Sequence, residues 1–207
     1  PVSGSDSATV AILNANSQVV ANKSANPTSV PEPGGQVVFT VQVTNTSTAD
    51  LVTITQLQDS IYHDVTSSGH DGILSTTCTV PQVLATNGGS YSCQFVAVVA
   101  GQAFTQHKNT LIASGIDDDT EPVSGADDAQ VTISNLPSSI LVSKTPNPTQ
   151  VPESGGNVSY TVVVTNTSTA DIVYIQQVVD NRFGDVGDSC APTLPASLAP
   201  SAKLVCT

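Results

Sequence analysis

Six carboxylates gather between residues 117 and 128, and no Lys or Arg lies in that stretch to neutralise them. Calcium takes about 6–8 oxygen ligands, which carboxylates on one loop can supply. The EF-hand spacing D-x-[DN]-x-[DN]-G is absent, however, and a solvated acidic face that keeps the protein soluble explains the same residues. Calcium binding and solvated charge therefore both remain open. The candidate calcium ligands are Asp117, Asp118, Asp119, Glu121, Asp127 and Asp128, and further acids could come from Asp59, Asp64, Asp180, Asp185 and Asp188.

The four cysteines fall into two pairs, with separations of 15 and 16 residues. Zinc sites need closer pairs such as C-x-x-C, and none occurs. We therefore expect two local disulfides, Cys78–Cys93 and Cys190–Cys206. Such bonds require an oxidising compartment, so the sequence predicts a protein that lies outside the cytoplasm.

Four N-x-[ST] sequons make asparagine glycosylation a candidate modification. Two of them open the same peptide, N-T-S-T-A-D, for which a turn that hydrogen-bonds its own backbone is the alternative interpretation. The candidate acceptors are Asn22, Asn45, Asn157 and Asn166.

Three histidines suggest metal or acid–base chemistry at first sight, because His63 and His70 each precede an aspartate. No G-x-S-x-G, H-E-x-x-H or P-loop pattern accompanies them. The related second half of the chain lacks counterparts of His63 and His70, which favours an ordinary surface loop. We expect no catalytic residues, no enzymatic activity and no cofactor other than the candidate calcium ion.

An internal repeat organises the whole chain. Pro1–Gly4 recurs at Pro122–Gly125, an offset of 121 residues, and Val43–Asp50 recurs unchanged at Val164–Asp171. The repeat starts out of phase, because residues 1–12 correspond to the end of a complete unit. The second copy has no counterpart of residues 95–133. We therefore expect a chain cut from a longer precursor, or one whose missing strands come from a neighbouring copy.

One copy of the repeat has the pattern of an antiparallel β-sandwich. In Gln36–Asn45, apolar residues alternate with mostly polar ones, as in a strand with one buried face. Short strands at regular spacing favour a sandwich. Further strands are expected at residues 51–58, 90–99, 108–114 and 129–133. We expect a closing strand of another unit at 1–13, a first unit at 14–133, a linker at 134–139 and an incomplete second unit at 140–207.

Four peptides and the cysteine pair together resemble a known domain. The peptides are Asn26–Gly35, Val43–Ser47, Asn109–Asp119 and Asp127–Ile133. It is the immunoglobulin-like tandem repeat of bacterial cell-surface proteins, long catalogued as a domain of unknown function. The resemblance covers nearly the whole chain. It implies an all-β fold of tandem immunoglobulin-like sandwiches in a surface stalk or fibre, and it implies no common ligand.

Composition excludes several classes of function. The net charge of −12 disfavours nucleic acid and anionic membranes as partners, and no apolar run is long enough for membrane insertion. We expect a structural repeat or filament subunit at the bacterial surface, assembled end to end with copies of itself through calcium, disulfides and possible strand exchange. The alternative is an adhesin that binds glycan or protein through the loop at residues 60–77.

Overall fold

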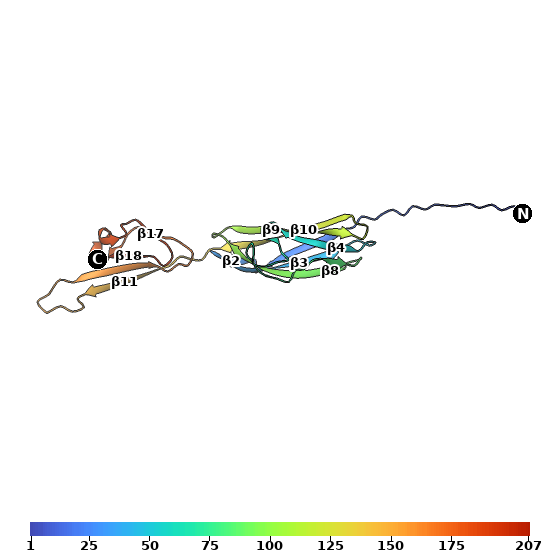
Figure 1. The fold of residues 1–207 in the computed structure, drawn as a ribbon. Helices are drawn as coiled ribbons and strands as arrows, with labels where there is room; N and C mark the ends of the chain where they lie inside the picture. Colours follow the sequence, from blue (N-terminus) through green and yellow to red (C-terminus); the bar gives the residue numbers. More distant parts are fainter. The chain divides into compact units, whose positions relative to one another are not determined.

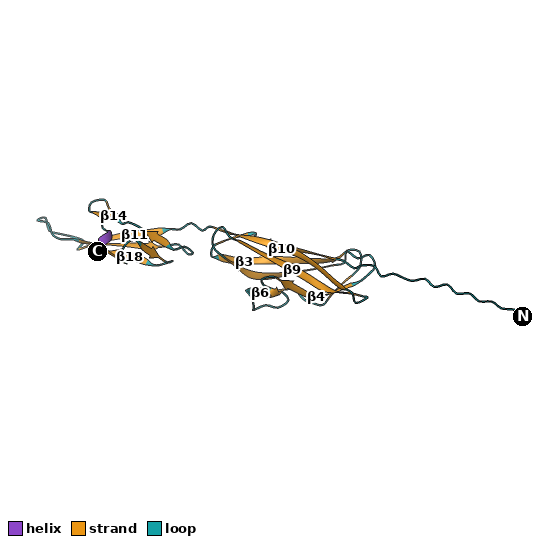
Figure 2. Cartoon of the chain, turned by 90° about the horizontal axis from the view of Figure 1, so that it is seen from above, coloured by secondary structure: helices purple, strands orange, loops and turns teal.

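The computed structural model describes residues 1–207, which divide into two compact units, Pro1–Ser134 and Asn135–Thr207. Strands make up nearly all of the regular structure, and the single helical element is a short 3-10 turn, η1 (Gly187–Ser189) (Figure 2). No helix of the chain has the length and apolar character needed to cross a bilayer. The predicted all-β class is confirmed.

The first unit consists of two sheets that enclose one core (Figure 1). One sheet has the order β1-β3-β8-β6. The other has the order β2-β10-β9-β4-β5, with β7 paired to β4. The strands are β1 (Val19–Asn26), β2 (Ser29–Pro31), β3 (Gly34–Asn45), β4 (Val52–Asp59), β5 (His63–Asp64), β6 (Ile73–Thr76), β7 (Gln82–Leu84), β8 (Ser90–Ala100), β9 (Gln106–Asp117) and β10 (Pro122–Ser134).

This strand order is that of an immunoglobulin-like sandwich. β1, β3, β8 and β6 take the places of strands A, B, E and D, while β10, β9 and β4 take those of G, F and C. β2 pairs in parallel with β10, and every other ladder is antiparallel. The first unit is therefore an immunoglobulin-like sandwich, as predicted.

The core follows the alternation of β3. Val37, Phe39, Val41 and Val43 are fully buried, as the sequence pattern predicted. Phe39 stacks on Phe95 of β8 with ring centroids 5.0 Å apart. Burial of these rings and aliphatic side chains is the main stabilising contribution that the first unit has.

The second unit repeats the first half of this plan with a smaller core. β12 pairs with β11 and β18, and β16 pairs with β18, in one four-stranded sheet. The buried apolar cluster has seven members, Val164, Ile175, Cys190, Ala196, Leu198, Leu204 and Cys206. Its strands are β11 (Ile140–Asn147), β12 (Ser159–Asn166), β13 (Val173–Ile175), β14 (Val179–Asp180), β15 (Gly184–Asp185), β16 (Cys190–Ala191), β17 (Ala196–Leu198) and β18 (Lys203–Cys206).

Some expected boundaries are corrected. β10 begins at Pro122 instead of residue 129, so much of the expected acidic loop belongs to a β-hairpin with β9. β1 was not among the expected strands. Residues 1–18 form no strand here, so the assignment of residues 1–13 as a closing strand of another unit stays a prediction. The division between the two compact units falls between Ser134 and Asn135, and the linker at residues 134–139 stays a prediction.

Candidate functional site: a buried lysine and its partners

Lys23 is a charged residue in the middle of the first core. On β1, the side chains of Val19, Ala21 and Lys23 alternate inward, and the lysine side chain has no solvent exposure. Its ammonium contacts Asp59 Oδ2 at the end of β4, whose side chain is equally inaccessible. The Nζ atom also lies 4.9 Å from the centre of the Phe39 ring and 5.7 Å from that of Phe95. β1 therefore places the Lys23 ammonium next to the rings of Phe39 and Phe95.

Asp59 is fixed by a network of donors. Its Oδ1 accepts the backbone N–H groups of Ile61 at 2.9 Å and Tyr62 at 3.1 Å. The Asn109 side-chain amide on β9 donates to both carboxylate oxygens, at 3.1 and 3.0 Å. Lys23 Nζ also donates to the backbone carbonyl oxygen of Asn109 at 3.3 Å. The carboxylate therefore holds the lysine and the asparagine together.

The Asn109 side chain, which contacts Asp59, has one polar atom without a hydrogen-bond partner. The residue is buried, and its Oδ1 makes no hydrogen bond. Buried polar atoms are nearly always paired, so an orphaned oxygen beside an ion pair needs an explanation. We call Lys23, Asp59 and Asn109 the interior triad.

Burial dominates the electrostatics around the triad. Desolvation lowers the pKa of the Lys23 ammonium, although the hydrogen bond and charge of Asp59 oppose this shift. Burial also raises the pKa of Tyr62 and lowers that of the nearby His107. Tyr62 OH and His107 Nε2 lie 3.0 Å apart at the rim of the same region. The site thus favours a lysine that gives up its proton more readily than one in water.

The second unit repeats the lysine–carboxylate pair but not the asparagine. Lys144 and Asp180, each 121 residues beyond its counterpart, form the equivalent contact. Lys144 Nζ lies 4.4 Å from the Tyr160 ring centre, at the place that Phe39 has in the first unit. The pair lines an open hollow of about 450 Å³ and is partly exposed. The hydrogen bond from Lys144 lowers the pKa of Asp180 to about 2.

The predicted calcium ligands do not converge. No three His, Cys, Asp or Glu side chains group in a way that could hold a metal ion. Asp117 instead accepts hydrogen bonds from Ser17 and from the N–H groups of Asp119 and Glu121. Asp127 accepts the Lys23 N–H at 2.7 Å, and Asp128 pairs with Lys108 at 3.2 Å. Asp118 and Asp119 are exposed. Calcium binding stays a prediction without a formed site.

Two of the four candidate glycosylation sites are corrected. Asn45 and Asn166 are fully buried. The Asn45 amide donates to the carbonyls of Asp50 and Leu84, while its Oδ1 accepts the Ser47 N–H. Asn166 makes the same three bonds in the second unit. Both side chains therefore stabilise turns and are not available as acceptors in the folded protein. Asn22 and Asn157 are exposed, and their modification stays a prediction.

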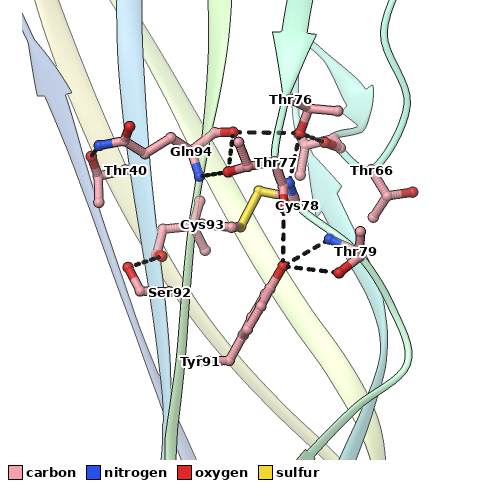
Figure 3. The surroundings of a disulfide bond; sticks show 12 residues. Thr40, Thr66, Thr76, Thr77, Cys78, Thr79, Tyr91, Ser92, Cys93 and Gln94 are labelled. Atoms are coloured by element: carbon pink, nitrogen blue, oxygen red, sulfur yellow. Dashed lines mark hydrogen bonds between the residues drawn. A yellow bond between two sulfur atoms is a disulfide. The ribbon is translucent and has the colours of Figure 1, made fainter.

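Both predicted disulfides form. Cys78–Cys93 connects β8 to the segment after β6, and Cys190–Cys206 joins the paired strands β16 and β18. Around the first bond, the Cys78 N–H donates to Thr76 and the Thr79 N–H donates to the Tyr91 hydroxyl (Figure 3). No cysteine is free. Disulfides of this kind persist in oxidising compartments, so the chain is an exported protein.

The histidine loop is a surface feature. One oxygen of Asp71 contacts Nδ1 of both His63 and His70 at 2.9 Å, and all three side chains reach solvent. Tyr62, which lies in the same loop, points inward and is buried in the core. The loop therefore offers a small polar surface, and its aromatic residue belongs to the fold.

The sequence contained one signal for the triad. Lys23 and Asp59 both recur at the repeat offset, as Lys144 and Asp180. Asp59 was considered only as an additional calcium ligand, and the structure corrects this, because its carboxylate is occupied by Lys23 and Asn109. Asn109 opens one of the peptides that carry the family resemblance, but nothing in that peptide indicated a role for its side chain.

No family model matches the chain, and no curated protein matches it. Two solved structures are similar at 11% identity. One is described as a chaperone–tip adhesin complex in the biogenesis of CFA/I fimbriae, with a TM-score of 0.32 over 88% of this chain and 83% of that one. The other is the class 5 fimbriae chaperone CfaA, with a TM-score of 0.30 over 88% and 84%. The fold assignment rests on the strand order described above.

Proposed function

We propose that this chain is part of a tandem array of immunoglobulin-like domains that forms an extracellular stalk or filament on a bacterial surface. The observation that carries the proposal is that both copies of the repeat keep the same stabilising features, although the lysine–aspartate pair is buried in the first unit and partly exposed in the second. Each has a lysine–aspartate pair, a buried asparagine turn and a disulfide. These features stabilise the inside of a domain, which is what a repeated spacer requires.

The same features argue for a structural role over catalysis. The repeated polar groups bind partners within their own unit, whereas an enzyme must leave its reactive groups free for a substrate. The resemblance to bacterial surface repeats supports the same conclusion. We therefore propose a non-enzymatic protein whose partners are further copies of the same domain.

End-to-end assembly could use strand exchange, because residues 1–12 repeat the sequence of β10. In the first unit, a side chain at Gly125 of β10 would come within 2.7 Å of the Val19 carbonyl on β1. Gly4 is the counterpart of Gly125 and has nothing within 4 Å. A donated segment would place Gly4 against β11, the counterpart of β1. Residues 1–12 would supply the counterpart of β10 but not that of β9.

A single substitution tests strand exchange. Gly4→Val should leave the folding of each unit unchanged, since Gly4 has open space around it. If copies exchange the segment, the variant should form fewer and shorter oligomers than the wild type in light scattering. Ala15→Val is the control, because Ala15 is also exposed and outside any strand but does not belong to the segment. Equal oligomer sizes for Gly4→Val and wild type would contradict exchange.

Electron microscopy of the native material tests the array itself and the proposed calcium. Regular filaments or long stalks are expected. If calcium contributes, a chelator should shorten or fray them, and unchanged filaments would remove calcium from the proposal. Isolated short particles in the native material would contradict the array.

An adhesin is the second candidate, because the loop at residues 60–77 carries an exposed polar cluster that the second unit lacks. His63, His70 and Asp71 form this cluster. Such a surface could contact a glycan or a host protein. Trimming residues 66–72 should abolish adhesion to host cells if the loop binds, and should leave filament length unchanged.

A further inference from the structure

The interior triad joins the two sheets of the first unit. Lys23 projects from β1 in one sheet, and Asp59 and Asn109 project from β4 and β9 in the other. The Lys23 and Asp59 side chains are wholly inaccessible, and Asn109 is buried beside them. A nucleophile, a carboxylate and a carboxamide are thus held together without water.

As a set of non-covalent contacts, this arrangement is a poor source of stability. Removing a lysine and a carboxylate from water costs free energy that their mutual attraction often fails to offset. Asn109 adds a second cost, because its Oδ1 is buried without a hydrogen bond. A fold that gained only an ion pair here would be served as well by apolar side chains.

We propose that Lys23 and Asn109 become joined by an intramolecular amide bond between Nζ and Cγ, with Asp59 as the proton carrier. This covalent cross-link goes beyond the proposed stalk function and does not depend on it. It would remove the buried charge of the lysine and give the asparagine oxygen a place in a new amide.

The reaction balances with the groups present. Asp59 takes a proton from the Lys23 ammonium, and the neutral amine attacks Cγ of Asn109 to form the new C–N bond. The carboxylic acid then returns the proton to the asparagine Nδ2, and the bond between Cγ and Nδ2 breaks to release ammonia. The attacking nitrogen still carries one proton more than an amide holds, and Asp59 passes this proton to the ammonia, which leaves as ammonium. The step needs no oxidant, metal or cofactor.

The contacts fit these roles. The Asp59 carboxylate accepts both the Lys23 ammonium and the Asn109 Nδ2, so a proton can pass from one nitrogen to the other through a single group. Burial lowers the pKa of Lys23, which favours the neutral amine that attacks. Lys23 Nζ already lies 3.3 Å from the backbone oxygen of Asn109. Proximity of this kind supplies much of the rate of an intramolecular reaction.

The side-chain carbon of Asn109 is a better target for attack by the Lys23 amine than that of Asp59. Both oxygens of the Asp59 carboxylate already accept hydrogen bonds, from two backbone N–H groups and from the Asn109 amide, so this side chain is placed to accept and donate protons. The Asn109 amide is neutral, and its leaving nitrogen already faces the proton carrier. The geometry therefore assigns the electrophile to Asn109.

Mass spectrometry of the full chain tests the bond. After reduction and alkylation of the cysteines, the wild type should be lighter than its sequence predicts by the mass of one ammonia molecule. Trypsin should fail to cut after Lys23 and should cut after Lys144, which provides a matched lysine in the same chain. The fragments should include a branched peptide that connects Lys23 to Asn109.

Variants locate the bond. Lys23→Met and Asn109→Ala should each restore the full sequence mass, whereas Lys144→Met should keep the shortfall. A wild-type chain of full mass would overturn the proposal, and because this test uses the unaltered chain, it does not depend on how the variants fold. A loss of one water molecule with a link from Lys23 to Asp59 would overturn the assignment of Asn109 as acceptor.

Discussion

Asn45 shows how much structural information one side chain can carry. Its amide satisfies two carbonyls and its oxygen satisfies one N–H, all within the interior of the sandwich. Its sequon suggests a glycan, whereas its burial assigns it to the turn. Asn166 performs the same task in the second unit, so this turn is part of the repeat itself.

Asn45→Ala should therefore destabilise the first unit by about 3 kcal/mol, because three backbone groups lose a partner inside the fold. Urea denaturation monitored by Tyr fluorescence provides the measurement. Asn22→Ala is the control, since Asn22 lies exposed on β1 and should change stability by less than about 0.5 kcal/mol. Equal stability for Asn45→Ala and wild type would show that the turn does not need the amide.

Asp180 gives the second unit a defined dependence on pH. The hydrogen bond from Lys144 lowers the pKa of Asp180 to about 2, whereas the unfolded carboxyl has an ordinary value of about 3.9. A lowered pKa means that the stabilisation is present above the unfolded value and is lost as the pH falls through the folded one. The second unit should therefore lose stability between about pH 4 and pH 2.

Asp180→Asn should remove this part of the acid sensitivity, which circular dichroism of acid titrations can measure. Asp118→Asn is a matched control on an exposed turn. If wild type and Asp180→Asn unfold with the same pH profile, the pair with Lys144 does not contribute to stability.

At the scale of elements, the comparison of β1 with β3 shows why the fold was easier to predict from the sequence than the site formed by Lys23, Asp59 and Asn109. The strand at β3 was found because its inward positions are all apolar, and the disulfides were found because paired cysteines recur. β1 was missed because its inward set includes Lys23, and a charged residue at a core position breaks the apolar pattern. The partners that make this lysine acceptable lie on β4 and β9, far away in sequence.

The β9–β10 hairpin extends further than the expected strands, because β10 begins at Pro122. Its many carboxylates suggested a loop around a cation, yet the strand pairing spreads them along two strands and a turn. Alternation places some of these acids toward solvent and leaves others to accept N–H groups, as Asp117 and Asp127 do. Charge density in sequence is therefore a weak guide to convergence in space.

The Cys78–Cys93 bond closes a short loop between neighbouring parts of one sheet. Cys78→Ala with Cys93→Ala should lower the stability of the first unit by about 3 kcal/mol, chiefly because the unfolded chain regains freedom. Differential scanning calorimetry measures the change. Cys190→Ala with Cys206→Ala is the companion variant, and it should affect the transition of the second unit and leave that of the first in place. A first-unit transition that is unchanged without Cys78–Cys93 would contradict the expectation.

At the scale of the whole molecule, the interior triad changes how a pulled chain carries force. Tension applied at the two chain ends enters the first unit through β1 and leaves it through β10. A bond from Lys23 to Asn109 would pass that tension directly between β1 and β9, so residues 24–108 would stay folded. Without the bond, those residues would extend by about 250 Å more, at about 3.5 Å per residue with the Cys78–Cys93 loop still closed.

Single-molecule stretching of the wild type and of Lys23→Met should show this difference in the length released by the first unit. The second unit should release the same length in both proteins, because no asparagine amide is hydrogen-bonded to Asp180, the partner of Lys144, and no such cross-link is expected there. Equal lengths for the first unit in the two proteins would mean that the force path runs through hydrogen bonds alone.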